Sequence, residues 1–271
     1  MKPLNLSTLS KPFIIAGPCV IENESLVMAI AERLKGYAAS YNLDFIFKAS
    51  FDKANRSSID SYRGPGLEKG LSILNNVRTQ LDLPVTTDIH ETYQVSEAAE
   101  VVDILQVPAF LCRQTDLLLH AAFTGKILNV KKGQFLSPQE MQNIAAKIES
   151  TGNGQYIFTE RGTSFGYNNL VVDMRSLAVM KQYAPWICFD ATHSVQRPGA
   201  QGTASGGDRE FVFPLTRAAL AVGVDALFFE VHPEPTQALS DGANSLQFSE
   251  FERILDYIKR FTRFQQNQPS A

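Results

Sequence analysis

The sequence has no surplus of positive charge, few cysteines and no long apolar run. Its 25 Lys and Arg against 28 Asp and Glu give a formal net charge of −3, which argues against general binding to nucleic acid or to an anionic membrane. Three cysteines are too few, and odd in number, for a disulfide framework, so the composition favours a reducing cytoplasm. The apolar stretch 13–21 contains Pro18 and is too short for a membrane span or a signal peptide.

The sequence also lacks features that would mark a boundary between two domains. No long linker, charge run or low-complexity tract separates two halves of the 271 residues. We therefore expect one domain over 1–271, with its core at about 12–262. The first predicted strand is followed by AGPCVIE rather than by a glycine-rich turn, so the sequence lacks the dinucleotide motif that an open doubly wound sheet would carry.

Strand-like and helix-like segments alternate along the whole chain. Several of the short β-rich runs are apolar throughout, as in strands buried on both faces. The runs cover 12–17, 44–50, 84–88, 103–108, 126–131, 155–160, 187–192 and 226–232. Segments of helical length lie between them, at 24–40, 66–81, 92–101, 115–125, 137–150, 174–184, 209–223 and 249–261. Eight such units predict an α/β fold, a closed (β/α)8 TIM barrel, with an open parallel sheet as the alternative.

The ends of the predicted strands carry polar or metal-ligating residues. In a (β/α)8 barrel the reactive groups lie at the C-terminal ends of the strands. These ends hold, in order, Cys19, Lys48, Asp88, Gln106, Lys131, Arg161, His193 and Glu230. Polar residues also follow strands simply because loops are solvated. A full row of them, with cations after the second, fifth and sixth strands, instead predicts a functional site at the mouth.

Two basic clusters are expected to face this mouth. The first lies in the loop after the second strand and consists of Lys48, Lys53, Arg56 and Ser57. The second follows the fifth and sixth strands and consists of Lys131, Lys132 and Arg161. Ammonium groups, guanidinium forks and a hydroxyl suit phosphate or carboxylate. The clusters predict two anionic substrates, or one with two anionic groups; the alternative is that each cation pairs with a nearby acid.

A mixed set of metal-ligating residues is spread over both ends of the chain. It consists of Cys19, His193, Glu230 and Asp241, the last in the loop after the eighth strand. Barrel closure makes the first and eighth strands neighbours, so these residues can converge. Soft and hard ligands together fit a divalent transition metal such as Zn²⁺, Fe²⁺ or Mn²⁺. The spacing leaves other interpretations open, since a buried cysteine is also a small hydrophobe and Asp241-Gly242 also reads as a turn.

The remaining histidines and two long loops are less informative. We assign no catalytic role to His90, His120 or His232. The loops at 197–208 and 232–245 are rich in Gly and Ser or in polar residues. Each fits a lid over the mouth as well as an ordinary surface loop.

Several motifs resemble those of the 3-deoxy-D-manno-octulosonate 8-phosphate synthases, also called 2-dehydro-3-deoxyphosphooctonate aldolases. They include IAGPCVIE, KANRSS, TTDIHE, NVKKGQFLSP, TERGTSFGYNNLVVD, DATHSVQ and ALSDG, and the match runs from about residue 12 to residue 260. KANRSS is specific, because the sister synthase that uses erythrose 4-phosphate has proline in place of the Ala-Asn pair. That sister synthase is the first alternative, followed by a retro-aldol lyase and a non-catalytic phosphosugar-binding barrel.

The resemblance implies a cytoplasmic homotetramer that makes the inner-core sugar of lipopolysaccharide. It would condense phosphoenolpyruvate with D-arabinose 5-phosphate and release inorganic phosphate. The resemblance places phosphoenolpyruvate on Lys53, Lys131 and Arg161, with Lys48 and Gln106 close by. It places the sugar phosphate on Asn55, Arg56 and Ser57, with Asp88 as a polar contact and Arg113 reaching the site of a neighbouring subunit.

The same family has a metal-dependent branch, with Cys, His, Glu and Asp as ligands, and a metal-free branch with Asn at the Cys position. The chain is similar to the first branch, because Cys19, His193, Glu230 and Asp241 are all present. The resemblance therefore implies a divalent metal of unknown identity. It also implies catalytic roles for Cys19, Lys53, His193 and Asp241.

Overall fold

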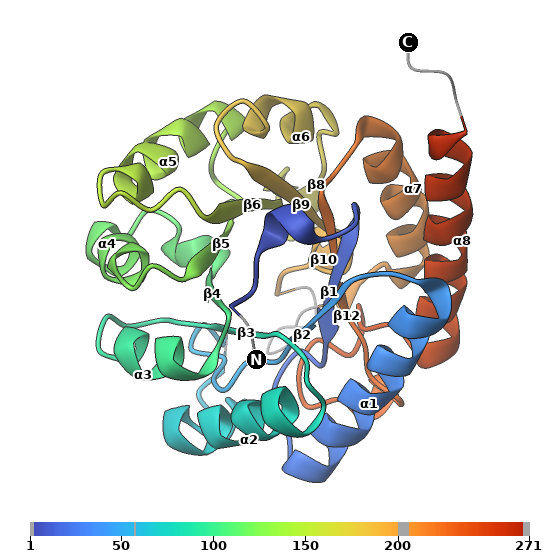
Figure 1. Cartoon of the computed structure of the whole chain (residues 1–271), viewed down its shortest axis with the longest axis horizontal. Coiled ribbons are helices and arrows are strands. Elements are labelled where there is room, and N and C mark those ends of the chain that lie inside the picture. The colour runs from blue at the N-terminus through green and yellow to red at the C-terminus, as the bar shows by residue number, and fades with distance from the viewer. Residues whose placement is uncertain (1–2, 57, 200–205, 268–271) are drawn as a thin grey trace.

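Eight parallel strands close into a barrel that the helices surround (Figure 1). The computed structural model describes residues 3–56, 58–199 and 206–267. The barrel strands are β1 (Phe13–Gly17), β2 (Phe45–Lys48), β3 (Val85–Asp88), β4 (Ile104–Val107), β5 (Ile127–Lys131), β6 (Tyr156–Glu160), β9 (Trp186–Asp190) and β12 (Ala226–Glu230). Pairing of β1 with β12 sets Gly17 beside Glu230 and closes the sheet. The prediction of a (β/α)8 barrel is confirmed, and the open sheet is wrong.

The outer ring consists of α1 (Glu24–Tyr41), α2 (Leu67–Gln80), α3 (Gln94–Val101), α4 (Thr115–Phe123), α5 (Met141–Glu149), α6 (Arg175–Met180), α7 (Val212–Val222) and α8 (Phe248–Gln266). Helix α6 is shorter than predicted, since it ends at Met180 and residues 181–183 form turns. Helix α8 is longer than predicted, since no Gly or Pro interrupts it. None of the helices described here is long and apolar enough to span a membrane.

Two small antiparallel pairs sit outside the barrel sheet. One joins β7 (Thr163–Ser164) to β8 (Leu170–Val171), in the connection that follows β6. The other joins β10 (Gln196–Arg197) to β11 (Gly206–Gly207), after β9. Both belong to the loops at the C-terminal ends of the strands, so they shape the mouth of the barrel.

The strands bury side chains on both faces. Alternate residues such as Phe13 and Ile15 point into the barrel and form an inner apolar cluster, while Ile14 packs outward against the helices. Leu6, in a short 3₁₀ helix (Leu6–Thr8), is fully buried against the inner cluster. The N-terminal segment crosses the barrel in Figure 1 and closes the end at which the strands begin.

Gly17 ends β1 where that strand lies closest to β2. A Cβ atom at this position would lie 1.9 Å from the carbonyl oxygen of Lys48. We expect Gly17→Ala to push β1 and β2 apart and to lower the free energy of unfolding by about 3 kcal/mol, as severe overpacking does. Urea unfolding measures this change.

A matched control for this substitution is Gly36→Ala, in the exposed middle of α1. A Cβ atom there has nothing within 4 Å. The exchange should leave stability unchanged or raise it by about 0.5–1 kcal/mol, because Ala favours the helix. Equal unfolding midpoints for the two variants would contradict the requirement for glycine at position 17.

Candidate active site

The strand ends meet at a polar cavity of about 170 Å³ in the mouth of the barrel. Ten of the predicted site residues line it: Lys48, Lys53, Asn55, Arg56, Asp88, Gln106, Lys131, Arg161, His193 and Asp241. Cys19 and Glu230 lie beside this lining and contact it through Asp241 and Lys48. Ser57 lies outside the described residues. Arg113 is exposed and away from the cavity, so its predicted role at a neighbouring subunit stays a prediction.

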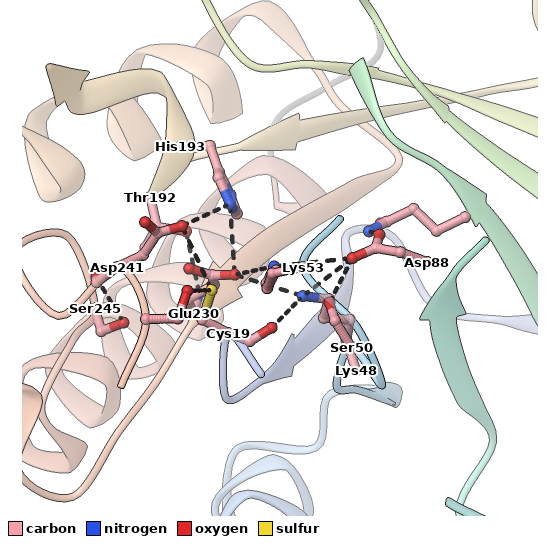
Figure 2. Close-up of polar contacts among 12 residues, drawn as sticks. Cys19, Lys48, Ser50, Lys53, Asp88, Thr192, His193, Glu230, Asp241 and Ser245 are labelled. Atoms are coloured by element: carbon pink, nitrogen blue, oxygen red, sulfur yellow. Dashed lines mark hydrogen bonds and ion pairs between the residues drawn. The ribbon is translucent and has the colours of Figure 1, made fainter. Parts of the chain in front are cut away.

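The four predicted metal ligands come together on one side of the site (Figure 2). Ligand atoms of Cys19, Glu230 and Asp241 all lie within 4.8 Å of one another. The Nε2 atom of His193 is 3.4 Å from Glu230 Oε1 and 3.8 Å from Asp241 Oδ2. The pairing of β1 with β12 explains this convergence, because it brings the loops after the first and last strands side by side.

The state of these side chains fits a divalent cation. Glu230 is fully buried, and its Oε2 atom has no hydrogen-bond partner in the described part of the chain. Burial raises the pKa of Glu230, but His193 and the nearby lysines outweigh it and bring the pKa to about 2, so this carboxylate is ionised. Burial, together with Asp241 and Glu230, raises the pKa of Cys19. A bound cation would reverse that effect and favour the thiolate.

Two lysines separate the metal ligands from Asp88. Lys48 is fully buried, and its ammonium group donates to the Cys19 carbonyl at 3.1 Å and lies 3.4 Å from Glu230 Oε1. Lys53 lies 3.8 Å from Asp88 Oδ2 and 3.9 Å from Glu230 Oε1. Burial lowers the pKa of both lysines, but the surrounding anionic groups outweigh it at Lys53 and raise its pKa. Lys53 is therefore a firmly charged ammonium facing the cavity.

Arg161 is a buried cation with unused hydrogen-bonding capacity. Its side chain is 5% exposed, and Nη2 donates to Gln196 Oε1 at 2.5 Å. Nη1 has no hydrogen-bond partner, and the guanidinium forms no ion pair, with the residues that the structure describes. Burial lowers the pKa of Arg161, and nearby carboxylates such as Asp190 and Asp241 oppose this effect without forming an ion pair with the guanidinium. An anionic ligand in the cavity would supply the missing partner.

The adjacent lysines after β5 point to different places. Lys131 lines the cavity, whereas Lys132 lies outside its lining. The Lys132 ammonium donates to Thr163 Oγ1 at 2.9 Å and to the Leu136 carbonyl at 3.3 Å, and so holds the neighbouring loop. The expectation that Lys132 belongs to the basic cluster of the mouth is therefore wrong, because successive residues at a strand end face opposite sides.

The loop after β2 contacts the loop that carries Asp241. Arg56 Nη2 donates to the Leu239 carbonyl at 3.2 Å, and Nη1 lies 3.9 Å from Asp241 Oδ1. The Leu239 amide in turn donates to Glu22 Oε1 at 3.0 Å. The candidate lid at 232–245 is thus tied to its neighbours. Of the other candidate, 197–208, residues 200–205 lie outside the described part of the chain.

Sequence reasoning missed several polar residues that hold the site together. Gln196 accepts from Arg161 and donates to Asp241 Oδ2 at 3.1 Å. Inside the barrel, Thr159 donates to Asn129, Asn129 donates to Gln106, and Gln106 donates to Asp88. Asp190 is fully buried at the end of β9. A polar residue within an apolar strand was the signal that could have found Asn129 and Asp190.

The comparisons with known proteins agree with one another. Residues 9–266 match the model of the DAHP synthetase I family. A 2-dehydro-3-deoxyphosphooctonate aldolase of Syntrophotalea carbinolica is 61% identical over 242 residues, which are 89% of this chain and 87% of that protein. A protein of the same name from Desulfatibacillum aliphaticivorans is 57% identical over 255 residues, 94% of this chain and 93% of its own. One from Fusobacterium nucleatum is 56% identical over 242 residues, 89% and 87% of the two chains.

Proposed function

The chain belongs to the DAHP synthetase I family and, within it, to the 2-dehydro-3-deoxyphosphooctonate aldolases, and from this premise we propose the reaction of its cavity. It condenses phosphoenolpyruvate with D-arabinose 5-phosphate and water. The products are 3-deoxy-D-manno-octulosonate 8-phosphate and inorganic phosphate. The observation that carries this proposal is the buried Arg161 guanidinium, without an ion pair to any described residue, in the same cavity as a set of metal ligands.

We assign the two substrates to different residues of the cavity according to the charge of the side chains and their depth. Phosphoenolpyruvate binds to Lys53, Lys131 and Arg161, with Lys48 and Gln106 beside them. Asn55, Arg56 and Ser57 hold the sugar phosphate nearer the mouth, where Asn55 is exposed. Asp88 orients Lys48, at the end of β2, and Lys53, in the loop after it. Arg113 completes the sugar-phosphate site of a neighbouring subunit. This last role requires more than one subunit, and we propose a homotetramer of a cytoplasmic, single-domain protein.

The cations serve to hold two anions side by side against their mutual repulsion. The double bond of phosphoenolpyruvate is the nucleophile, and its C3 atom attacks the aldehyde carbon of the sugar. Water adds to C2, where positive charge develops, and the resulting hemiketal phosphate loses inorganic phosphate by C–O cleavage. Alignment of the two reacting carbons contributes several kcal/mol, up to about 7–11 kcal/mol for ideal alignment. Asp241 lines the cavity, and we assign to its carboxylate the movement of the protons of the water and the new hydroxyl, while both ring nitrogens of His193 are engaged.

Cys19, His193, Glu230 and Asp241 would hold a divalent metal in this site. Their mixture of thiol, imidazole and carboxylate suits Zn²⁺, Fe²⁺ or Mn²⁺. When bound, such an ion supplies Lewis-acid polarisation of the aldehyde oxygen. Lys48 keeps the ligand cluster in place through its contacts with Glu230 and the Cys19 carbonyl.

Phosphate release tests the proposed reaction and its sugar. Metal-supplemented protein is mixed with phosphoenolpyruvate and either arabinose 5-phosphate or erythrose 4-phosphate. We expect release with the five-carbon sugar to exceed that with the four-carbon sugar by at least about 10-fold, a difference of about 1.4 kcal/mol in transition-state binding.

The other outcomes lead to the alternatives. A preference for erythrose 4-phosphate would move the chain to the sister synthase and overturn the interpretation of KANRSS. Absence of release with both sugars would favour a lyase or a binding protein. Borohydride trapping with substrate then identifies a Schiff-base lyase, whereas binding without turnover identifies a non-catalytic barrel.

A further inference from the structure

Asp190 contacts both the anion-binding cations and the metal ligands of the site, but it does not line the cavity. It ends β9 and is fully buried. Its Oδ2 atom lies 2.5 Å from Lys131 Nζ and 2.7 Å from His193 Nδ1. Its Oδ1 atom accepts the backbone N–H of His193 at 2.9 Å and the Thr192 hydroxyl at 3.2 Å. A single carboxylate therefore meets one of the cations of the anion site and one of the metal ligands.

The contact with His193 determines which ring nitrogen remains for a ligand. Because Nδ1 lies against Asp190, Nε2 faces Glu230 and Asp241, at 3.4 Å and 3.8 Å. The contact at Nδ1 is a close charge contact without hydrogen-bond geometry, and the hydrogen bond from the His193 backbone N–H to Asp190 Oδ1 fixes the turn that carries the ring. A carboxylate on one imidazole nitrogen selects the tautomer and the orientation in which the other nitrogen binds metal.

The contact with Lys131 fixes a flexible cation in the cavity wall. The Lys131 ammonium lies 2.5 Å from Asp190 Oδ2 and 3.7 Å from the centre of the Phe228 ring. Four rotatable carbons separate this ammonium from β5, so its position depends on such contacts. Asp190 reaches it across β6, which lies between β5 and β9 in the barrel.

Thr192 extends the same network to a third residue. Its hydroxyl donates to Asp190 Oδ1 and accepts the backbone N–H of Glu230 at 3.1 Å. Thr192 and Glu230 lie close together in Figure 2. The start of the loop after β9 is thereby tied to the end of β12.

We propose that Asp190 is a positioning residue that orients His193 toward the metal and Lys131 toward phosphoenolpyruvate, so that one carboxylate couples the two halves of the site. This inference rests on the proposed function. Asp190 does not line the cavity, so it acts through its neighbours.

Asp190→Asn is the variant that separates charge from shape. The asparagine amide has nearly the same size as the carboxylate. Its NH₂ group, however, replaces one of two carboxylate oxygens, both of which face hydrogen-bond donors. One orientation sets NH₂ against the Lys131 ammonium, and the other sets it against the His193 backbone N–H. Both orientations therefore lose a contact that the carboxylate makes.

The test measures two affinities in protein that is not turning over. Metal-free protein is titrated with Zn²⁺ alone in competition with a chelating dye. Metal-loaded protein is then titrated with phosphoenolpyruvate by calorimetry. We expect Asp190→Asn to weaken Zn²⁺ binding by about 10- to 100-fold, as loss of an outer-shell carboxylate does. We expect phosphoenolpyruvate to bind about 10-fold more weakly.

Asp225→Asn is the matched control. Asp225 is also buried, accepts the Ile187 backbone N–H at 2.9 Å and lies 2.6 Å from Lys11 Nζ. It precedes β12, at the opposite end of the barrel from the cavity. This variant should lose thermal stability but keep both affinities within about twofold, because it disturbs no group of the site.

Thr192→Val provides a second, milder test if Asp190→Asn does not fold. It removes the hydroxyl link to Glu230 and keeps the Asp190 carboxylate. We expect weaker Zn²⁺ binding, by several-fold, with unchanged affinity for phosphoenolpyruvate. Folded Asp190→Asn with parental affinities, or an Asp225→Asn variant that loses both affinities to the same extent, would overturn the positioning role. Failure of the parent protein to bind phosphoenolpyruvate would instead contradict the proposed function.

Discussion

Arg161→Ala is expected to lower kcat/KM for phosphoenolpyruvate by about 100- to 1000-fold. The guanidinium is buried, keeps one nitrogen without a hydrogen-bond partner among the described residues and forms no ion pair with them. Truncating one partner of a buried charge pair costs about 2–5 kcal/mol, or about 30- to 5000-fold in rate, and the expected loss lies in the middle of this range. Initial rates of phosphate release, at varied phosphoenolpyruvate and saturating sugar, measure the effect.

Two further variants make the Arg161 result specific. Arg161→Lys keeps the positive charge but loses the two parallel N–H donors of the guanidinium, so we expect a kcat/KM between those of the parent and of Arg161→Ala. Arg175→Ala removes an arginine whose side chain is 88% exposed on α6, and it should leave the kinetics unchanged. Full activity in Arg161→Ala would rule out this residue as a phosphoenolpyruvate ligand.

Removal of the metal is expected to have a second large effect. Exhaustive chelation should reduce phosphate release by more than about 100-fold, because Lewis-acid stabilisation of this kind contributes several kcal/mol. Zn²⁺, Fe²⁺ or Mn²⁺ should restore the activity to different extents. Restoration by each ion in turn, followed by phosphate assay, also identifies the preferred metal.

Cysteine variants connect that loss to the proposed ligands. Cys19→Ala should bind metal weakly and lose activity, whereas Cys112→Ala should keep both. Cys112 is an equally buried cysteine, but it lies outside the metal-ligand group. Cys19→Asn should keep some activity without metal, if the chain can work like the metal-free branch of its family. Unchanged activity after complete chelation would contradict a metal-dependent reaction.

The sequence predicted the barrel because its signals are local and repeated. Apolar runs, helical periodicity and short connections identify each strand-helix unit separately. The presence of eight such units then predicts a closed barrel. The strand-end rule then placed Lys48, Arg161 and His193 in one mouth although they lie far apart in the chain. The convergence of Cys19 with Glu230 needed only the pairing of the first and last strands.

The remaining features depend on side-chain directions and contacts between strands. Lys132 follows Lys131 directly but points into the neighbouring loop. The number of basic residues in a segment does not show in which direction each side chain points. Asp190 and Gln196 act through hydrogen bonds to residues on other strands and loops, so no local pattern reveals their partners. Arg113 concerns a second subunit and therefore remains a prediction.

The buried Leu6, at the end of the barrel where the strands begin, bears on the order in which the substrates bind. Leu6 belongs to the inner apolar cluster that fills the barrel, whereas the cavity is lined by residues at the C-terminal ends of the strands and in the loops that follow them. Lys131 and Arg161 lie deep, each 5% exposed, whereas Asn55 stands at the rim. The proposed assignment of phosphoenolpyruvate to these deep cations predicts that it binds before the sugar phosphate, which would otherwise cover them. The depth of the two proposed binding sites would then set the order of substrate binding.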